Sequence, residues 1–196
     1  AEPELQAPRR PGLPRGRLTS EKVCKAIGAL LPERAIVVDE SQTSGVLLAS
    51  FTRGAPRHDV LTLTGGAIGQ GLPTATGAAL ACPDRPVLAL CGDGSAMYTF
   101  QALWTIARER LNVTTVVFNN RSYAILNVEL QRVGARGDGE KARAQLDLRA
   151  PEIDFVRLSE GLGVPAVRAT TAEEFSAALE RALRTPGPHL IEAVVP

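Results

Sequence analysis

The sequence predicts an α/β protein built as a doubly wound parallel sheet of about six strands, with helices on both faces. Two observations lead to this prediction. Short apolar runs of strand length alternate with segments of helical period along most of the chain. Strands that are separated by helices of this length pair in parallel, because each helix carries the chain back across the sheet.

Local signals place the individual elements. Ser20 is expected to cap the first helix, and Thr171 and Glu174 form a capping-box pattern at the start of the last one. A glycine-rich segment, 65–71, is expected to turn from a strand into a helix of small residues. The expected strands are 35–38, 60–64, 87–91, 113–118, 164–169 and 188–195, and the expected helices are 20–30, 73–81, 96–109, 153–161 and 171–183, with a further helical stretch after residue 45.

Two polar segments stand outside this pattern. Residues 1–17 contain four prolines and four arginines without an apolar period, which predicts an extended linker or tail. Residues 134–143 are polar and contain glycine, and we expect this segment to be mobile. The remaining chain, residues 18–196, is expected to form one domain that is long enough for a substantial core.

The composition argues against several functional classes. The net charge is only +1, which gives no electrostatic reason to expect binding to nucleic acid or to an anionic membrane. The longest apolar runs are too short to cross a bilayer, and the polar start of the sequence lacks the pattern of a signal peptide. Three widely spaced cysteines, Cys24, Cys82 and Cys91, are expected to be buried free thiols in a cytoplasmic protein.

Polar residues follow two apolar runs at the points where the expected strands end. Gly92, Asp93 and Gly94 follow one run, and Asn119 and Asn120 close the next. Because adjacent parallel strands end at the same edge, Asp93 and Asn120 should emerge side by side. A carboxylate and an amide oxygen beside the start of a helix suit Mg²⁺ that carries a phosphorylated ligand.

These residues resemble the diphosphate and metal signature of thiamin-diphosphate enzymes, Gly-Asp-Gly followed at a distance by Asn-Asn; here 24 residues separate the two parts. The likeness extends through residues 65–107, 119–126 and 187–196. Over roughly residues 18–196, the chain looks similar to the diphosphate-binding domain of the benzoylformate decarboxylase and acetolactate synthase group. The resemblance is specific for the cofactor and does not identify the substrate.

The resemblance implies a metal site and a diphosphate site. Asp93, Asn120 and the backbone carbonyl of Ser122 correspond to ligands of Mg²⁺ or Ca²⁺. Gly94 would bring its N–H close to a phosphate, since it has no side chain. The cofactor-binding set that the resemblance implies is Gln42, Thr43, Gly66, Ile68, Gly92, Asp93, Gly94, Ser95, Asn120, Ser122, Tyr123 and Ala124.

Two parts of that set have more specific implied roles. Gln42 and Thr43 correspond to diphosphate-binding side chains, although relatives often carry a smaller hydroxyl residue at the first position. The carbonyl of Gly66 would accept a hydrogen bond from the aminopyrimidine ring, and Ile68 would hold the cofactor in its bent form.

The resemblance also implies what this stretch lacks. The glutamate that activates the cofactor belongs to a separate pyrimidine-binding domain, usually on a neighbouring subunit, so no catalytic residue is assigned here. The implied activity is that of a 2-oxo acid decarboxylase or carboligase, assembled as a homodimer or homotetramer. Neither the 2-oxo acid nor the presence of FAD in a middle domain can be read from this sequence.

Two other functions remain as alternatives. A nicotinamide-dependent dehydrogenase has a similar fold, but its third glycine and its acidic residue after the second strand are missing. A non-catalytic cofactor-binding or assembly subunit would keep the fold without turnover. His58 and His189 are expected to be structural, and the pair Phe100 and Trp104 to lie in the core. Tyr123, Ile125, Leu126 and Val128 are expected to be mainly the packed apolar face of a helix, although the resemblance implies that this helix often lines the substrate pocket.

Overall fold

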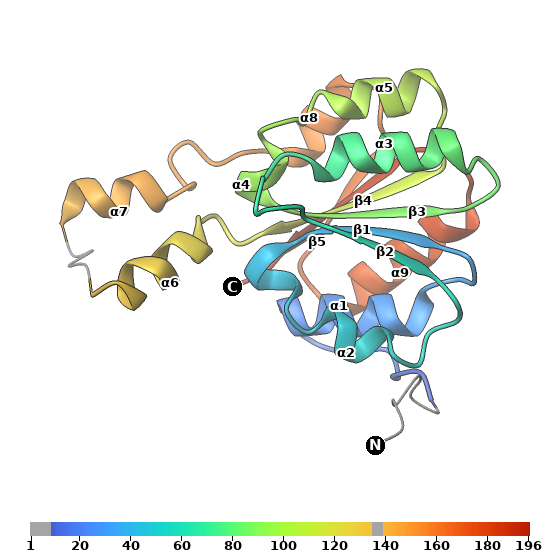
Figure 1. Ribbon diagram of the computed structural model, residues 1–196, viewed down its shortest axis with the longest axis horizontal. Coiled ribbons are helices and arrows are strands. Elements are labelled where there is room, and N and C mark those ends of the chain that lie inside the picture. Colours follow the sequence, from blue (N-terminus) through green and yellow to red (C-terminus); the bar gives the residue numbers. More distant parts are fainter. Residues whose placement is uncertain (1–8, 135–138) are drawn as a thin grey trace.

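A computed structural model of the protein describes residues 9–134 and 139–196. Within these residues six strands form a single sheet in which every pair is parallel, in the order β2-β1-β3-β4-β6-β5 (Figure 1). The predicted fold class is therefore confirmed. The strands are β1 (Ile36–Glu40), β2 (Asp59–Thr62), β3 (Val87–Gly92), β4 (Val113–Asn119), β5 (Ala166–Ala169) and β6 (His189–Val194).

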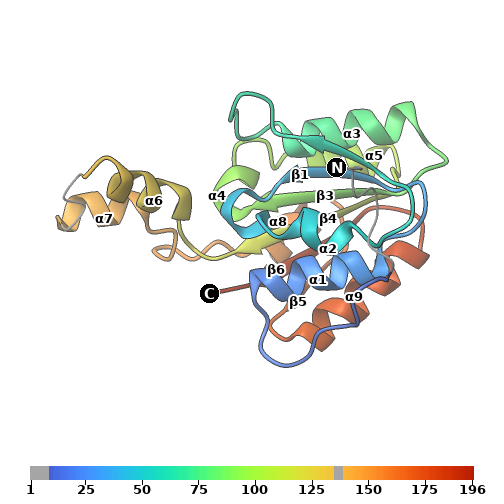
Figure 2. The ribbon, with the colours of Figure 1, turned by 60° about the horizontal axis from the view of Figure 1, so that its bottom comes forward.

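Helices cover both faces of the sheet (Figures 1 and 2). One face carries α1 (Ser20–Leu30), α2 (Leu48–Thr52) and α9 (Ala172–Arg184), and the other carries α3 (Gly71–Ala81), α5 (Ala102–Arg108) and α8 (Phe155–Gly161). Each face has its own core, with Phe118 and Phe175 in the first and Phe155 and Leu103 in the second. β3 and β4 supply side chains to both cores, as expected for the central strands of a doubly wound sheet.

Side-chain caps fix the starts of α1 and α9, two of the three helices on the first face. Thr19, and not Ser20 as predicted, caps α1, because its hydroxyl accepts a hydrogen bond from the Lys22 N–H. The capping box of Thr171 and Glu174 at α9 is confirmed. The two helices start side by side, since the N–H of Leu18 donates to the carbonyl of Thr170.

The predicted linker is only partly described, because residues 1–8 lie outside the described residues. The stretch 9–17 runs along the domain without a helix. The Arg10 guanidinium donates to the carbonyls of Ala29 and Leu31 at the end of α1, and the Gly16 N–H donates to Glu173. The assignment of 1–17 as a linker remains a prediction.

The predicted helix 96–109 is wrong at its start. A single turn, α4 (Asp93–Ala96), follows β3 directly, and turns lead to α5 at Ala102. Phe100 therefore precedes α5 and is buried, whereas Trp104 is 51% exposed and lies against the Arg108 guanidinium, 4.9 Å from its ring centre. The prediction that both rings lie in the core holds for Phe100 alone.

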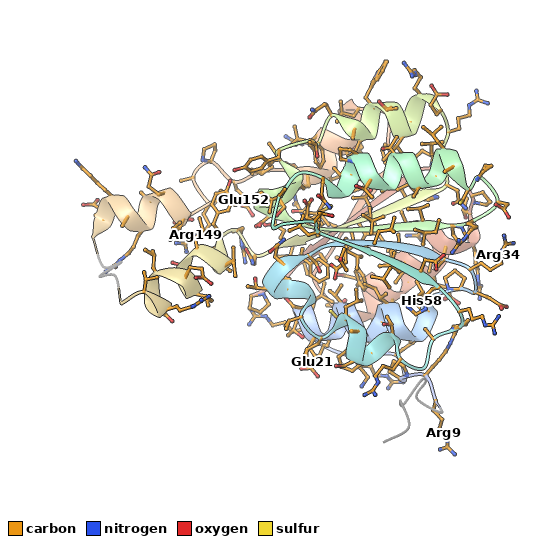
Figure 3. All side chains as sticks on the ribbon, viewed as in Figure 1. Arg9, Glu21, Arg34, His58, Arg149 and Glu152 are labelled. Carbon is orange, nitrogen blue, oxygen red and sulfur yellow. The ribbon has the colours of Figure 1, made fainter. Side chains whose placement is uncertain are left out.

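Two helices project from the carboxyl edge of the sheet as an arm (Figure 1). They are α6 (Ala124–Arg132) and α7 (Glu140–Leu146), and no described residue of either is buried. Figure 3 shows their side chains spread on both sides of the arm, away from the sheet. The expectation that Ile125, Leu126 and Val128 pack mainly in the core is wrong, since they are 37%, 46% and 50% exposed.

The segment that was expected to be mobile overlaps this arm. Residues 135–138 lie outside the described residues, while residues 140–143 belong to α7. The structure described here therefore leaves the expectation for 134–143 untested. No helix in the described ranges is both long enough and apolar enough to cross a membrane.

The strand order places a crevice between β1 and β3. The chain leaves β1 toward β2 at one edge and then crosses back to β3, so that the connections after β1 and β3 run in opposite directions. Such a switch point opens a crevice at the carboxyl ends of the strands, which is where α/β proteins bind ligands. The short 3₁₀ turn η1 (Gln42–Gly45) follows β1, and α4 follows β3, on the two sides of this crevice.

Candidate functional site

A small hollow of about 30 Å³ lies at this switch point, where β1, β3 and β4 end. Three connections line it: the segment after β1, the Gly-Asp-Gly turn and α4 after β3, and the turn after β4 that leads into α6. Its lining residues are Ser41, Gln42, Thr43, Ser44, Gly92, Asp93, Gly94, Ser95, Asn120, Ser122, Tyr123, Ala124 and Ile125. The predicted cofactor-binding residues, except Gly66 and Ile68, are thus brought together.

Asp93 is the buried anionic group of the hollow. Its side chain is almost fully enclosed, and its two oxygens accept hydrogen bonds from the Gly94 N–H at 2.8 Å and the Arg121 N–H at 2.6 Å. Burial raises the pKa of this carboxyl, while the backbone donors oppose the shift. Among the described residues no ion pair involves Asp93, so the electrostatics of the hollow favour a cation.

The turn after β4 brings a second side-chain oxygen, that of Asn120, to the hollow. The Asn120 side-chain oxygen accepts a hydrogen bond from the Ser122 N–H at 2.9 Å, which closes a tight turn. Arg121 sits between them in the left-handed region, with φ 58°. The Ser122 hydroxyl and the Tyr123 N–H both contact the carbonyl of Leu146, so the end of α7 is fastened to this turn.

Gly94 is needed for the close approach of a side chain that the sequence did not suggest. A β-carbon at this position would overlap the ring of Tyr123, which lies directly over the glycine. Its N–H already donates to Asp93. The prediction that this N–H faces a phosphate remains untested, and the ring contact is an additional reason for glycine here.

The segment after β1 forms the opposite wall. Gln42 has a positive φ of 53°, and Thr43 and Gln42 are both half-buried beside the Gly-Asp-Gly turn. The Asp39 carboxylate accepts hydrogen bonds from the N–H and the hydroxyl of Ser41, which fixes the start of this wall. Glycine is required at Gly45, since a β-carbon there would collide with Ser41.

Glu40, the last residue of β1, is a functional candidate that the sequence did not single out. It is 1% exposed, and its Oε1 accepts hydrogen bonds from the N–H groups of Gly69 and Gln70 at 2.6 and 3.1 Å. Its Oε2 has no hydrogen-bond partner within the described part of the chain. Burial raises the pKa of this carboxyl. The only sequence signal was its position next to a strand end, which any polar loop residue shares.

Glu40 holds the end of the glycine-rich loop at Gly69 and Gln70, whereas the other end, at Gly65 and Gly66, is exposed. Thr99 donates to the carbonyl of Gly69, so both backbone groups of Gly69 are fixed. Gly66 has a positive φ of 73° and is exposed, and Ile68 is half-buried. The hollow includes neither residue, and their predicted contact with the aminopyrimidine ring remains a prediction.

Residues that were expected to be structural have local roles. His58 and His189 each form a hydrogen bond to a nearby backbone carbonyl, of Pro56 and Thr185. Cys24 and Cys91 are buried, Cys82 is half-buried, and all three are free. Burial raises the pKa of Cys24 to about 12 and that of Cys91 well above its ordinary value. Within the described residues no cluster of three or more His, Cys, Asp or Glu could hold a metal ion.

The hollow nevertheless fits a metal that a phosphorylated ligand helps to hold. Mg²⁺ takes one or two protein carboxylates and completes its shell with phosphate oxygens, amide oxygens and water. Asp93 supplies a buried carboxylate, and Asn120 supplies an amide oxygen on the neighbouring turn. A cation would also compensate the burial of the Asp93 charge. The donor set therefore suits Mg²⁺ or Ca²⁺ better than a metal that prefers sulfur or nitrogen.

Comparison with known proteins identifies the family. Residues 41–193 match the model of the family described as "Thiamine pyrophosphate enzyme, C-terminal TPP binding domain". The chain belongs to this family. The matched region begins at Ser41, directly after β1, and contains every residue that lines the hollow. The resemblance predicted from Gly-Asp-Gly and Asn-Asn is therefore confirmed, and the dehydrogenase alternative is wrong.

Individual relatives belong to the predicted group. The chain is 63% identical over 188 residues to a Mycobacterium tuberculosis protein named provisionally as the acetolactate synthase large subunit IlvX, covering 95% of this chain and 36% of that protein. It is 35% identical over 190 residues to benzoylformate decarboxylase of Pseudomonas aeruginosa, covering 94% of this chain and 34% of that protein.

A solved structure agrees with these sequences. The thiamine diphosphate-dependent 4-hydroxybenzoylformate decarboxylase of Rhodococcus jostii superimposes with a TM-score of 0.84 at 34% identity, over 97% of this chain and 35% of that chain. This chain spans about a third of the length of the curated relatives that it matches.

Proposed function

We propose that this chain binds the diphosphate group of thiamin diphosphate together with Mg²⁺ at the hollow between β1, β3 and β4. Asp93, Asn120 and the carbonyl of Ser122 would ligate the metal. The side chains of Gln42, Thr43 and Ser95 would bind the diphosphate from the facing walls of the hollow. Family membership supports the cofactor, and the convergence of these segments supports the site.

The observation that carries this proposal is the enclosed carboxylate of Asp93. It lies beside an amide oxygen, at the switch point of the sheet, with no ion-pair partner among the described residues. Bound Mg²⁺ would neutralise the diphosphate and fix its orientation, which is the chemistry that the metal supplies. The residues of the hollow would hold the cofactor in one place, while the fastened turns keep the ligands from moving.

The complete protein would be a 2-oxo acid decarboxylase or carboligase. In this proposal a pyrimidine-binding domain supplies the activating glutamate, and the cofactor lies between the two domains of a homodimer or homotetramer. The names of the relatives support both chemistries, so the choice between decarboxylation and carbon–carbon bond formation stays open. FAD is not assigned. The free cysteines suit a reducing compartment, and the proposal places the protein in the cytoplasm.

Asp93→Ala tests the proposal, with Asp84→Ala as the matched control. Asp84 is an exposed carboxylate at the opposite edge of the sheet, paired with Arg34. Isothermal titration would measure Mg²⁺-dependent binding of thiamin diphosphate. Even residues that only orient a metal ligand change affinity about 10- to 100-fold, so loss of a ligand should weaken binding by about 100-fold or more. Unchanged binding by Asp93→Ala would refute the metal assignment.

A second measurement separates the enzymatic proposal from its alternative. The chain alone should release no carbon dioxide from pyruvate or benzoylformate above background, because the activating glutamate is proposed to lie elsewhere. Turnover by the purified chain would contradict that proposal. A longer protein that binds the cofactor through this domain and still lacks turnover would favour the non-catalytic cofactor-binding or assembly subunit.

A further inference from the structure

The two neighbouring asparagines after β4 point to different places. Asn120 faces the hollow. Asn119 is 3% exposed, and its side-chain amide donates to the Oε1 of Glu192 on the adjacent strand β6 at 2.6 Å. The carbonyl of Asn119 accepts a hydrogen bond from the N–H of Val195 at 3.0 Å. Asn119 is therefore held through its backbone and its side chain by the same neighbouring strand.

Glu192 is itself held by a chain of charged groups. It is 1% exposed, and its Oε2 accepts a hydrogen bond from Arg168 on β5 at 2.8 Å. Arg168 also donates to Asp154, the residue that caps α8, at 3.2 Å. Arg168 lies directly opposite Glu192 in the sheet, and Glu192 lies opposite Val117, two residues before Asn119. The row therefore crosses three strands on one face, and ends at the turn that leads into the hollow.

That turn needs external support. Arg121 has a φ of 58°, a region that side chains other than glycine adopt reluctantly. Such a conformation persists only where the surrounding structure holds it. On one side the Asp93 carboxylate binds the N–H of Arg121. On the other side, Asn119 and Glu192 fix the residue from which the turn begins.

We propose that Glu192, acting through Asn119, is a positioning residue for the turn 119–122. It sets the place of the Asn120 oxygen and the Ser122 carbonyl, although neither Glu192 nor Asn119 touches the metal. The inference rests on the proposed metal site. Stability alone gives little reason for the arrangement, because apolar residues often replace buried ion pairs without loss. Because Arg168, Glu192 and Asn119 lie in a row that ends at the end of β4, next to the turn that holds Arg121 in the left-handed region, we assign the row a positioning role.

The test compares Asn119→Ala and Glu192→Gln with Ser159→Ala. Ser159 is fully buried on α8 and donates to the carbonyl of Val164, so its loss removes a buried hydrogen bond away from the turn. Amide hydrogen exchange by NMR would report on the N–H groups of Arg121 and Ser122, with those of α9 as an internal reference. Titration with Mn²⁺ in the presence of thiamin diphosphate would report on the metal.

The expected result is specific to the turn. The Arg121 and Ser122 amides should exchange about tenfold faster or more in Asn119→Ala and Glu192→Gln, while α9 is unchanged. The affinity for Mn²⁺ should fall about 10- to 100-fold, as is typical for residues that orient metal ligands. The double variant should lose little more than either single variant, because the two residues act as a unit. Ser159→Ala should change neither measurement.

The outcomes separate this inference from the proposed function. Exchange at Arg121 and Ser122 within about twofold of the parent chain in both variants would overturn the positioning role. If exchange is faster in both variants, but metal binding changes neither in them nor in Asp93→Ala, the positioning role is upheld and the metal site is refuted. If either variant fails to fold, Arg168→Gln removes only the half-exposed outer member, and should shift exchange at the same two amides in the same direction.

Discussion

Two regions meet at the carboxyl edge of the sheet and differ in how they are held. The turns at 92–95 and 119–122 are fixed by buried hydrogen bonds to Asp93 and Glu192 and rest on strands with fully enclosed side chains. The arm of α6 and α7 begins two residues later, yet none of its described residues is buried. It is fastened to the sheet mainly where Leu146 meets Ser122 and Tyr123.

The difference separates a preformed site from an adaptable surface. Regions with few buried contacts open at low free energy, whereas buried strands open only with the whole fold. The proposed diphosphate and metal ligands therefore lie on the rigid side. The exposed apolar residues of α6, Ile125, Leu126 and Val128, lie on the other side.

The largest expected effect comes from the same change made in both regions. Leu90 is fully buried in β3, just before the Gly-Asp-Gly turn, and Leu126 is 46% exposed on α6. Leu90→Ala should lower the free energy of unfolding by about 3–5 kcal/mol through lost burial and a cavity. Leu126→Ala should change it by less than about 0.5 kcal/mol. Urea denaturation measures both, and similar losses would mean that the arm packs in solution.

A pair of glycine substitutions probes the boundary between the regions. Gly94→Ala places a methyl group against the Tyr123 ring, and overpacking of this kind destabilises by about 1–3 kcal/mol. Gly77→Ala, in a helix position with open space among the described residues, should instead stabilise by about 0.5–1 kcal/mol. Thermal unfolding gives the signs. A stabilising Gly94→Ala would show that Tyr123, the first residue of the arm side, moves freely.

The third comparison concerns the pH dependence of stability through Glu40. Its pKa is raised in the folded protein by burial, so the folded state holds the proton more tightly than the unfolded state. Its contribution is fully present below the ordinary value of 4.5, and is lost as the pH rises through the folded pKa. Within that window the stability of the parent chain should fall, relative to Glu40→Gln, by up to about 1.4 kcal/mol per pH unit.

Urea unfolding of the parent chain and of Glu40→Gln, repeated between pH 5 and pH 8 in steps of about one pH unit, measures this difference in the free energy of unfolding. Asp39→Asn is the matched control, because Asp39 is the neighbouring carboxylate of the same strand and is only half-buried. Parallel curves for the parent chain and Glu40→Gln would show that Glu40 does not hold its proton more tightly when folded.

The strands were the most predictable elements. Each predicted strand is present, and the ends that matter, at Glu40, Gly92 and Asn119, lie within two residues of the prediction. Buried parallel strands are short and mainly apolar, so their composition marks them directly even where a charged residue such as Glu40 or Glu192 interrupts them. Parallel pairing then brings their carboxyl ends to one edge, and this was sufficient to predict that Asp93 and Asn120 approach each other.

The failures have a common cause. Trp104, Leu126 and Val128 are apolar residues with helical spacing, and the pattern favours burial for them. Leu126 and Val128 are exposed because α6 leaves the edge of the domain. Trp104 is exposed because α5 starts only at Ala102 and buries Leu103 and Ile106 against the sheet instead. An apolar pattern indicates that a helix face can be buried, but it does not indicate which other element, if any, covers that face.

By itself, the sequence determined the alternation of strands and helices, the parallel sheet, the approach of Asp93 and Asn120 at one edge, and the cofactor family. These features follow from local sequence patterns and from motif residues that parallel strand pairing brings to the same edge of the sheet. Only the tertiary structure decided that Glu40 holds the glycine-rich loop, that Tyr123 covers Gly94, and that Asn119 turns to Glu192 while Asn120 turns to the hollow. Each of these contacts joins residues far apart in the chain or alternates across a strand, and local pattern carries no information on partners of that kind.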